Sequence, residues 1–101
     1  MIPEILSVLN DQSVESSRGW KIKILSVSSF LYQEAGKTLR FALEDCPNET
    51  GEMEWIIFLP ENWAWNKPFH GEPVPSEKRA EILNRIDLAF WKLDMKIKEV
   101  V

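Results

Sequence analysis

The amino-acid sequence predicts an α+β fold in which an antiparallel sheet of four to five strands, arranged as a meander, packs against a C-terminal amphipathic helix. A short N-terminal helix is expected before the sheet. Apolar and basic residues alternate strictly at 20–24, as in a strand with one buried face. Between 82 and 93, apolar residues recur every three or four positions, as in a helix with one buried face. The 101 residues fit a single domain that spans 1–101.

The first half of the chain is expected to form a helix and then strands. Apolar residues recur between positions 2 and 9 after Pro3, which favours a short helix, and the polar residues that follow read as a linker up to residue 17. Gly36 lies between two β-prone stretches and is typical of a turn with positive φ, so 28–44 is expected to form a hairpin. The expected strands of this half are 20–24, 28–33 and 38–44.

The second half is expected to contain a strand, a long loop, a helix and a last strand. The apolar run at 52–59 predicts a strand that Pro60 ends, and the Pro- and Trp-rich residues 60–75 predict an ordered loop. Ser76 is expected to cap the following helix, with Glu77 in its first turn. Alternation at 95–101 predicts the last strand.

Composition limits the class of protein. The net charge of −4 argues against a general nucleic-acid binder, because lysine and arginine supply most of the affinity for phosphates. No apolar run reaches the roughly 20 residues that cross a bilayer, and the N-terminus lacks the pattern of a secretory signal. The single cysteine, Cys46, excludes an internal disulfide and is flanked by acidic residues that disfavour a reactive thiolate. We therefore expect a cytoplasmic protein that does not associate with membranes.

Charge is distributed unevenly along the chain. Residues 18–40 carry five bases and one acid, Glu34. Residues 41–66 carry no base and six acids, namely Glu44, Asp45, Glu49, Glu52, Glu54 and Glu61. The middle of the chain is therefore the acidic part.

No constellation of residues predicts catalysis. The only histidine, His70, has a possible partner in Glu72, but no nucleophile motif accompanies it, so a loop side chain or an interface contact is the favoured interpretation. Glu52 and Glu54 would suit acid–base chemistry in a sheltered cleft, although a solvated strand face is commoner. Metal ligands with a recognised spacing and phosphate-binding glycine loops are both missing. We therefore expect no enzyme activity, no metal and no cofactor.

Five tryptophans are many for a chain of this length. Trp20 and Trp55 fit inward positions of strands, and Trp91 beside Phe90 is also expected in the core. Trp63 and Trp65 lie two apart in the predicted loop, where they would either pack onto the sheet or anchor an interface, since interfaces favour tryptophan ringed by polar groups.

The C-terminal half combines the loop segment 68–75, Ser76-Glu77-Lys78-Arg79 at the helix start, a helix core at 82–86 and a short last strand. With Arg18-Gly19 as weaker support, this combination resembles small immunity proteins of bacterial polymorphic toxin and contact-dependent inhibition systems. It implies a cytoplasmic protein that binds one cognate toxin and blocks its active site or a surface that the toxin needs.

The acidic segment agrees with such a role, because a toxin that cuts nucleic acid presents cations around its active site. A basic, nuclease-like toxin is therefore the expected partner, with no direct nucleic-acid contact. The residues expected to contact it are Glu44, Asp45, Glu49, Glu52, Glu54, Glu61, Trp63, Trp65, His70 and Glu72. Three alternatives remain open: an adaptor domain with another protein partner, a small enzyme using His70 and Glu72, and a weak nucleic-acid binder using Lys21 and Lys23.

Overall fold

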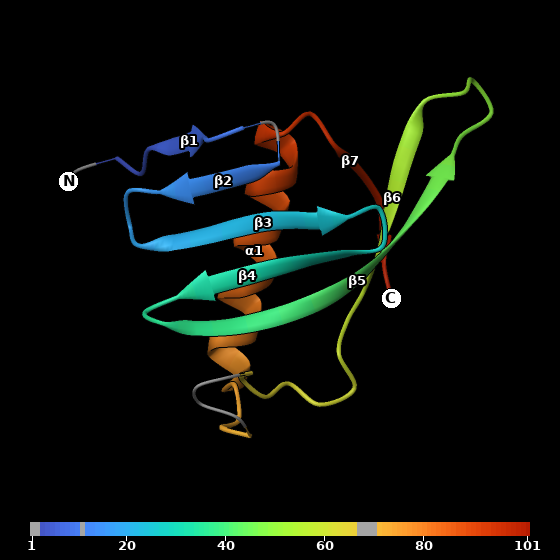
Figure 1. The fold of residues 1–101 in the computed structure, drawn as a ribbon. Helices are drawn as coiled ribbons and strands as arrows, with labels where there is room; N and C mark the ends of the chain where they lie inside the picture. The colour runs from blue at the N-terminus through green and yellow to red at the C-terminus, as the bar shows by residue number, and fades with distance from the viewer. Residues whose placement is uncertain (1–2, 11, 67–70) are drawn as a thin grey trace.

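A computed structural model describes residues 3–10, 12–66 and 71–101 and shows one curled sheet around one helix (Figure 1). The sheet has seven strands in the spatial order β1-β2-β3-β4-β5-β6-β7, which is also their order in the chain. The elements are β1 (Leu6–Val8), β2 (Ser13–Ser16), β3 (Trp20–Ser26), β4 (Ser29–Glu34), β5 (Lys37–Pro47), β6 (Met53–Phe58), α1 (Ser76–Lys92) and β7 (Lys96–Val100).

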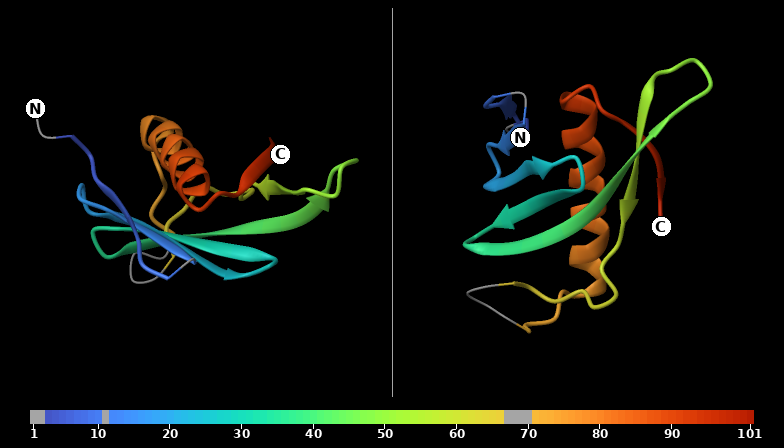
Figure 2. Two further views of the ribbon diagram at one scale, coloured as in Figure 1. Left: turned by 90° about the horizontal axis from the view of Figure 1, so that it is seen from above. Right: turned by 45° about the vertical axis from the view of Figure 1, so that its right-hand side comes forward.

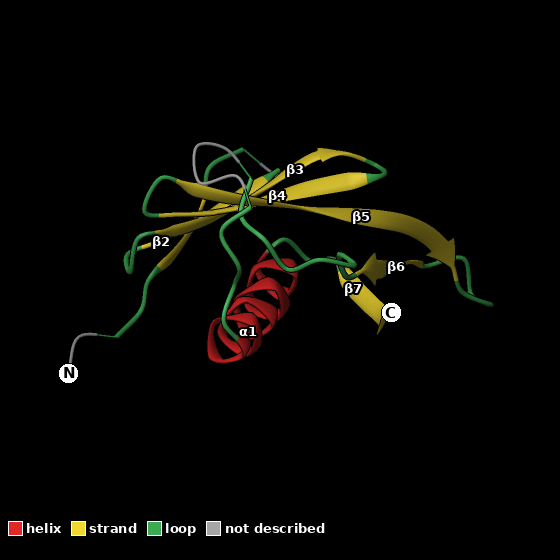
Figure 3. Cartoon of the chain, turned by 90° about the horizontal axis from the view of Figure 1, so that it is seen from below, coloured by secondary structure: helices red, strands yellow, loops and turns green. Residues whose placement is uncertain are grey.

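The sheet is larger than the sequence predicts, and it is mixed. Each of β1 to β6 runs antiparallel to the next strand, whereas β7 runs parallel to β6. Seen along the sheet, the strands curl into a half-barrel whose concave side holds α1 (Figures 2 and 3). The expectation of four to five antiparallel strands is therefore wrong. Strand β7 is parallel because the chain leaves β6, crosses the sheet through α1 and returns beside β6 in the same direction.

The predicted N-terminal helix is also wrong. The segment expected to be helix contains the edge strand β1, and the expected polar linker forms β2 between β1 and β3. Ser13, Val14 and Ser16 of β2 are buried, so two serines of the expected linker belong to the sheet interior rather than to solvent. The apolar residues near the N-terminus suggest a helix by their spacing, but the free edge of β3 offers backbone partners that decide the local structure.

The core lies between the sheet and α1. Phe30 on β4 stacks on Phe41 on β5, with ring centroids 4.9 Å apart, and its ring meets Phe90 of the helix edge-on at 5.1 Å. Ile82 and Ile86 are buried beside them, which confirms the predicted apolar face of the C-terminal helix. The start of the helix differs from expectation: Ser76 is its first residue, Pro75 precedes it, and no side chain caps it.

No helix within the described ranges is long and apolar enough to cross a membrane.

Candidate protein-binding site

The strands β5 and β6 form a hairpin that extends beyond the helix and projects from the rest of the molecule (Figures 1 and 2). Its outer part pairs Leu43–Pro47 with Met53–Ile57, from the pair Leu43 and Ile57 to the pair Pro47 and Met53. We call residues 43–57 the acidic hairpin. The strand expected at 38–44 is longer than predicted, because β5 continues through Cys46 and Pro47.

The tip of the acidic hairpin is organised by Asn48. Its Oδ1 accepts hydrogen bonds from the Thr50 backbone N–H (3.0 Å), the Thr50 hydroxyl (2.7 Å) and the Glu52 backbone N–H (3.0 Å). Its Nδ2 donates to Glu54 Oε2 (2.7 Å). Gly51 has a φ of +86°, a conformation that side chains disfavour. The side chain of Asn48 therefore holds the turn in one conformation, so the tip of the hairpin is ordered before any partner binds.

The acidic hairpin gathers five of the predicted contact residues, which are Glu44, Asp45, Glu49, Glu52 and Glu54. Glu54 lies 3.8 Å from the exposed Lys96 ammonium of β7. Among the described residues, none of the other four carboxylates forms an ion pair with a lysine or arginine. The hairpin is thus a projecting concentration of negative charge, which attracts cationic surfaces.

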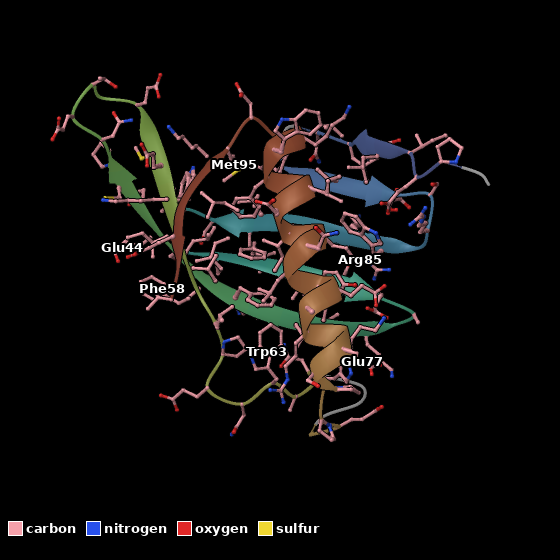
Figure 4. The ribbon with its side chains drawn as sticks, turned by 180° about the vertical axis from the view of Figure 1, so that it is seen from behind. Glu44, Phe58, Trp63, Glu77, Arg85 and Met95 are labelled. Atoms are coloured by element: carbon pink, nitrogen blue, oxygen red, sulfur yellow. The ribbon has the colours of Figure 1, made fainter. Side chains whose placement is uncertain are left out.

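The two loop tryptophans do not join this cluster. Trp65 is buried, with 3% of its surface exposed, and stacks near Tyr32 at 6.4 Å between ring centroids. Trp63 is half-buried, meets Phe41 edge-on at 5.7 Å and has the Arg79 guanidinium over its ring at 5.8 Å. Figure 4 shows Trp63 at the helix start, away from Glu44. In the structure, these tryptophans pack the loop onto the sheet.

The remaining predicted residues are also outside the acidic hairpin. Glu61 is exposed in the loop after β6, and Glu72 forms an ion pair with Lys37 at 3.2 Å. His70 lies outside the described residues. The nine predicted contact residues that the structure describes therefore divide into five on the acidic hairpin and four, namely Glu61, Trp63, Trp65 and Glu72, in the segment 60–75.

A second polar cluster joins the helix to the sheet. The buried Tyr32 hydroxyl donates to Glu34 Oε1 at 2.6 Å and accepts from Arg85 Nη1 at 2.6 Å. Lys78 donates to Glu34 Oε2 at 3.2 Å, and both Arg85 and Lys78 form ion pairs with Glu81. We call these residues the helix clamp.

The electrostatics of the helix clamp follow from these contacts. Burial raises the pKa of the Tyr32 phenol, and its hydrogen bond to Glu34 raises it further. The hydrogen bond from Lys78 lowers the pKa of Glu81. Burial opposes the charged form of Lys78, but hydrogen bonds to Glu81 and Glu34 outweigh it and raise the pKa of Lys78. The charged groups of the clamp bind one another, so the clamp is explained by its role in holding α1 on the sheet.

The N-terminal segment is tied to the sheet by one carboxylate. Glu4 Oε2 accepts hydrogen bonds from the Ser16 hydroxyl and from Trp20 Nε1, the latter at 2.7 Å. The hydrogen bond from Ser16 lowers the pKa of Glu4. The polar residues at 10–17 of the sequence concealed this contact, which depends on side chains 12 and 16 positions apart.

The basic strand expected to face water does so in part. On β3, Trp20 and Ile22 are buried and Lys23 is exposed, as the alternation predicts, whereas Lys21 is half-buried. No aromatic residue shares the exposed face with Lys23 on this strand, so stacking of nucleic-acid bases there has no structural support.

The prediction that Trp91 lies in the core is wrong, because its side chain is 75% exposed. The helical spacing already indicates this exposure. Trp91 is five residues after the buried Ile86, which places it roughly 140° around the helix from that residue. Three or four residues are the spacings that share a face.

No protein-family model matches this chain, and no curated protein or solved structure does so either. The site must therefore be interpreted from its own geometry. Within the described residues, no group of three or more histidine, cysteine, aspartate or glutamate side chains is arranged to hold a metal ion.

Proposed function

We propose that this protein is an immunity protein that neutralises a cognate toxin, a nuclease, by placing the acidic hairpin against the cationic surface around the toxin's active site. The observation that carries the proposal is the projecting hairpin, which holds five carboxylates in a stretch of chain, 41–66, that has no lysine or arginine. The resemblance of the C-terminal half to immunity proteins supports the same role.

Charge and shape act together in this mechanism. A nuclease cleft is lined with cations that bind phosphates, and a projecting acidic element is complementary to such a cleft in both respects. Because Asn48 already orders the hairpin tip, binding requires little further ordering of the hairpin, which favours affinity. The bound hairpin would exclude nucleic acid from the cleft, so inhibition needs no catalysis by the immunity protein. The proposal implies a cytoplasmic site of action.

The first experiment identifies the partner. The tagged protein is co-purified with the product of the gene immediately upstream in its source genome, and that product is expressed alone and together with this chain. The proposal predicts a tight complex, growth arrest by the upstream product alone and rescue on co-expression. Absence of both complex and toxicity would contradict the proposal.

The second experiment locates the contact. Glu44→Lys combined with Asp45→Lys should weaken toxin binding by at least about tenfold, because like charges then face each other across the interface. Glu15→Lys combined with Glu77→Lys is the matched control, since both residues are exposed acids outside the hairpin and the change in net charge is the same. Equal weakening by both pairs would show that only net charge matters and that the hairpin is not the contact.

A further inference from the structure

The inner face of the acidic hairpin continues the core side of the sheet but is not covered by the helix. Residues opposite each other on paired antiparallel strands share a face. The pair Leu43 and Ile57 is buried, and the next pairs on that face are Asp45 with Trp55 and Pro47 with Met53. Trp55 is only partly buried and Met53 is exposed. The core face therefore continues beyond α1 as a strip that carries Trp55, Met53 and Pro47 together with one carboxylate, Asp45.

Other apolar side chains extend this strip. Trp55 lines a hollow of about 220 Å³ together with the apolar Ile24, Leu25, Val27 and Met95 and the polar Gln12 and Ser26. Val27, in the turn between β3 and β4, is 70% exposed, and Leu25 is exposed as well. A surface on which large apolar side chains from β3, β6 and the segment before β7 converge is uncommon on a protein that acts alone.

Trp91 borders the same surface. Met95 lines the hollow that contains Trp55 and also a neighbouring hollow with Trp91, Asp94 and Lys96. Figure 4 shows Met95 between the end of the helix and the hairpin. We define the apolar shelf as Leu25, Val27, Met53, Trp55, Trp91 and Met95.

We propose that the apolar shelf is the centre of the toxin interface, with Asp45 as the carboxylate that shares its face. This inference rests on the proposed function and adds the chemistry of the toxin face, which must carry an apolar or aromatic side chain that enters the shelf beside its cations. Specific interfaces commonly combine an apolar centre with a polar rim, and exposed tryptophans are frequent anchors.

The position and the charge of the acidic hairpin indicate which partner binds the apolar shelf. Asp45 shares a face and a register pair with Trp55, so one carboxylate of the hairpin lies beside the apolar side chains of the shelf. A partner attracted by the hairpin is therefore brought onto the shelf in the same encounter. A second copy of this chain would bring the same acidic hairpin beside this one, which charge repulsion disfavours.

The test uses the purified chain and the purified product of the gene immediately upstream. Val27→Ser combined with Trp91→Ser removes two exposed side chains of the shelf, and Ile5→Ser combined with Val101→Ser removes two exposed apolar side chains elsewhere. Thermal unfolding of both variants establishes that they remain folded. Kd is measured by calorimetry at low and at high salt, and sedimentation gives the oligomeric state.

The shelf variant is expected to raise Kd by at least about tenfold with an unchanged salt dependence, and the control variant by less than about twofold. A shelf variant that binds like the wild type, while Glu44→Lys with Asp45→Lys weakens binding, overturns the shelf and leaves the proposed function standing. A wild-type dimer that the shelf variant dissociates without loss of toxin affinity assigns the shelf to self-association and also overturns the inference. No binding by the wild-type chain overturns both proposals.

Discussion

Arg85 is the residue on which the attachment of the helix depends most. Its guanidinium binds Tyr32, Glu34 and Glu81, and it lies over the Trp20 ring at 5.7 Å. Its side chain is largely buried, so a replacement that cannot donate hydrogen bonds removes the donor to the Tyr32 hydroxyl and leaves Glu34 with Lys78 as its remaining cation among the described residues.

Arg85→Met is therefore expected to reduce the free energy of unfolding by about 3 kcal/mol, measured by urea denaturation. Arg40→Met is the matched control, because Arg40 is exposed and makes one 3.3 Å hydrogen bond to Ser29, and it should change stability by less than about 1 kcal/mol. Equal effects of the two substitutions would show that the helix clamp contributes little to the attachment of α1.

The identity of a residue as tryptophan did not predict whether its side chain is buried or exposed. Trp20 and Trp65 are buried, Trp63 is half-buried and Trp91 is exposed. The alternation of β3 was enough to place Trp20, because a strand buries every second residue. Trp65 lies in an irregular loop without a period, so its burial depended on packing against Tyr32 that no local pattern encodes.

At the scale of the elements, the acidic hairpin consists of two parts: the paired strands β5 and β6, and the turn at its tip, which pairs with no other strand that the structure describes. The tip beyond Pro47 and Met53 has no helix beneath it, so its order depends on Asn48 and on backbone bonds such as Asn48 N–H to Glu52 O at 2.8 Å. Loss of the Asn48 side chain should therefore act locally rather than on the whole fold.

Asn48→Ala is expected to speed hydrogen exchange of the Thr50 and Glu52 amides by about tenfold, because both lose their acceptor. Global unfolding should shift little. Asn62→Ala is the control, since Asn62 is exposed and its side chain has no hydrogen bond to any described residue. A large drop in global stability, or unchanged exchange at the tip, would contradict this account of the turn.

The helix α1 and strand β3 were predicted correctly because each has a strong period. The helix was recognised because Ile82, Ile86 and Phe90 recur at helical spacing, and β3 because its alternation is strict. Strands β1 and β2 were missed because they are only three and four residues long, and their apolar residues do not alternate over enough positions to exclude a helix.

For the whole molecule, the linear strand order implies a gradient of local stability. Strand β4 has a paired neighbour on both sides and carries the buried Phe30 and Tyr32, whereas β1 is an edge strand with exposed residues and a partner on one side only. Local opening therefore requires far less disruption at β1 than at β4.

Amide hydrogen exchange followed by NMR should show this gradient. Ladder amides of β4 are expected to exchange at least about a hundredfold more slowly than those of β1. Similar protection in the two strands would mean that the sheet opens only as one unit and that the edge at β1 is as stable as the centre.

The sequence by itself determined the C-terminal helix, the central hairpin of β4 and β5 and the acidity of the middle segment, because composition and local periodicity encode these features. Only the tertiary structure decided that β1 and β2 extend the sheet, that β7 joins it in parallel and that Trp65 is buried while Trp91 is exposed. It also decided that the carboxylates project on a hairpin beside an apolar shelf, apart from the loop tryptophans. The physical reason is that contacts between residues distant in the chain decide three things: which strands pair, which strands lie at the edges of the sheet, and how much of the sheet α1 covers. No local sequence pattern contains that information.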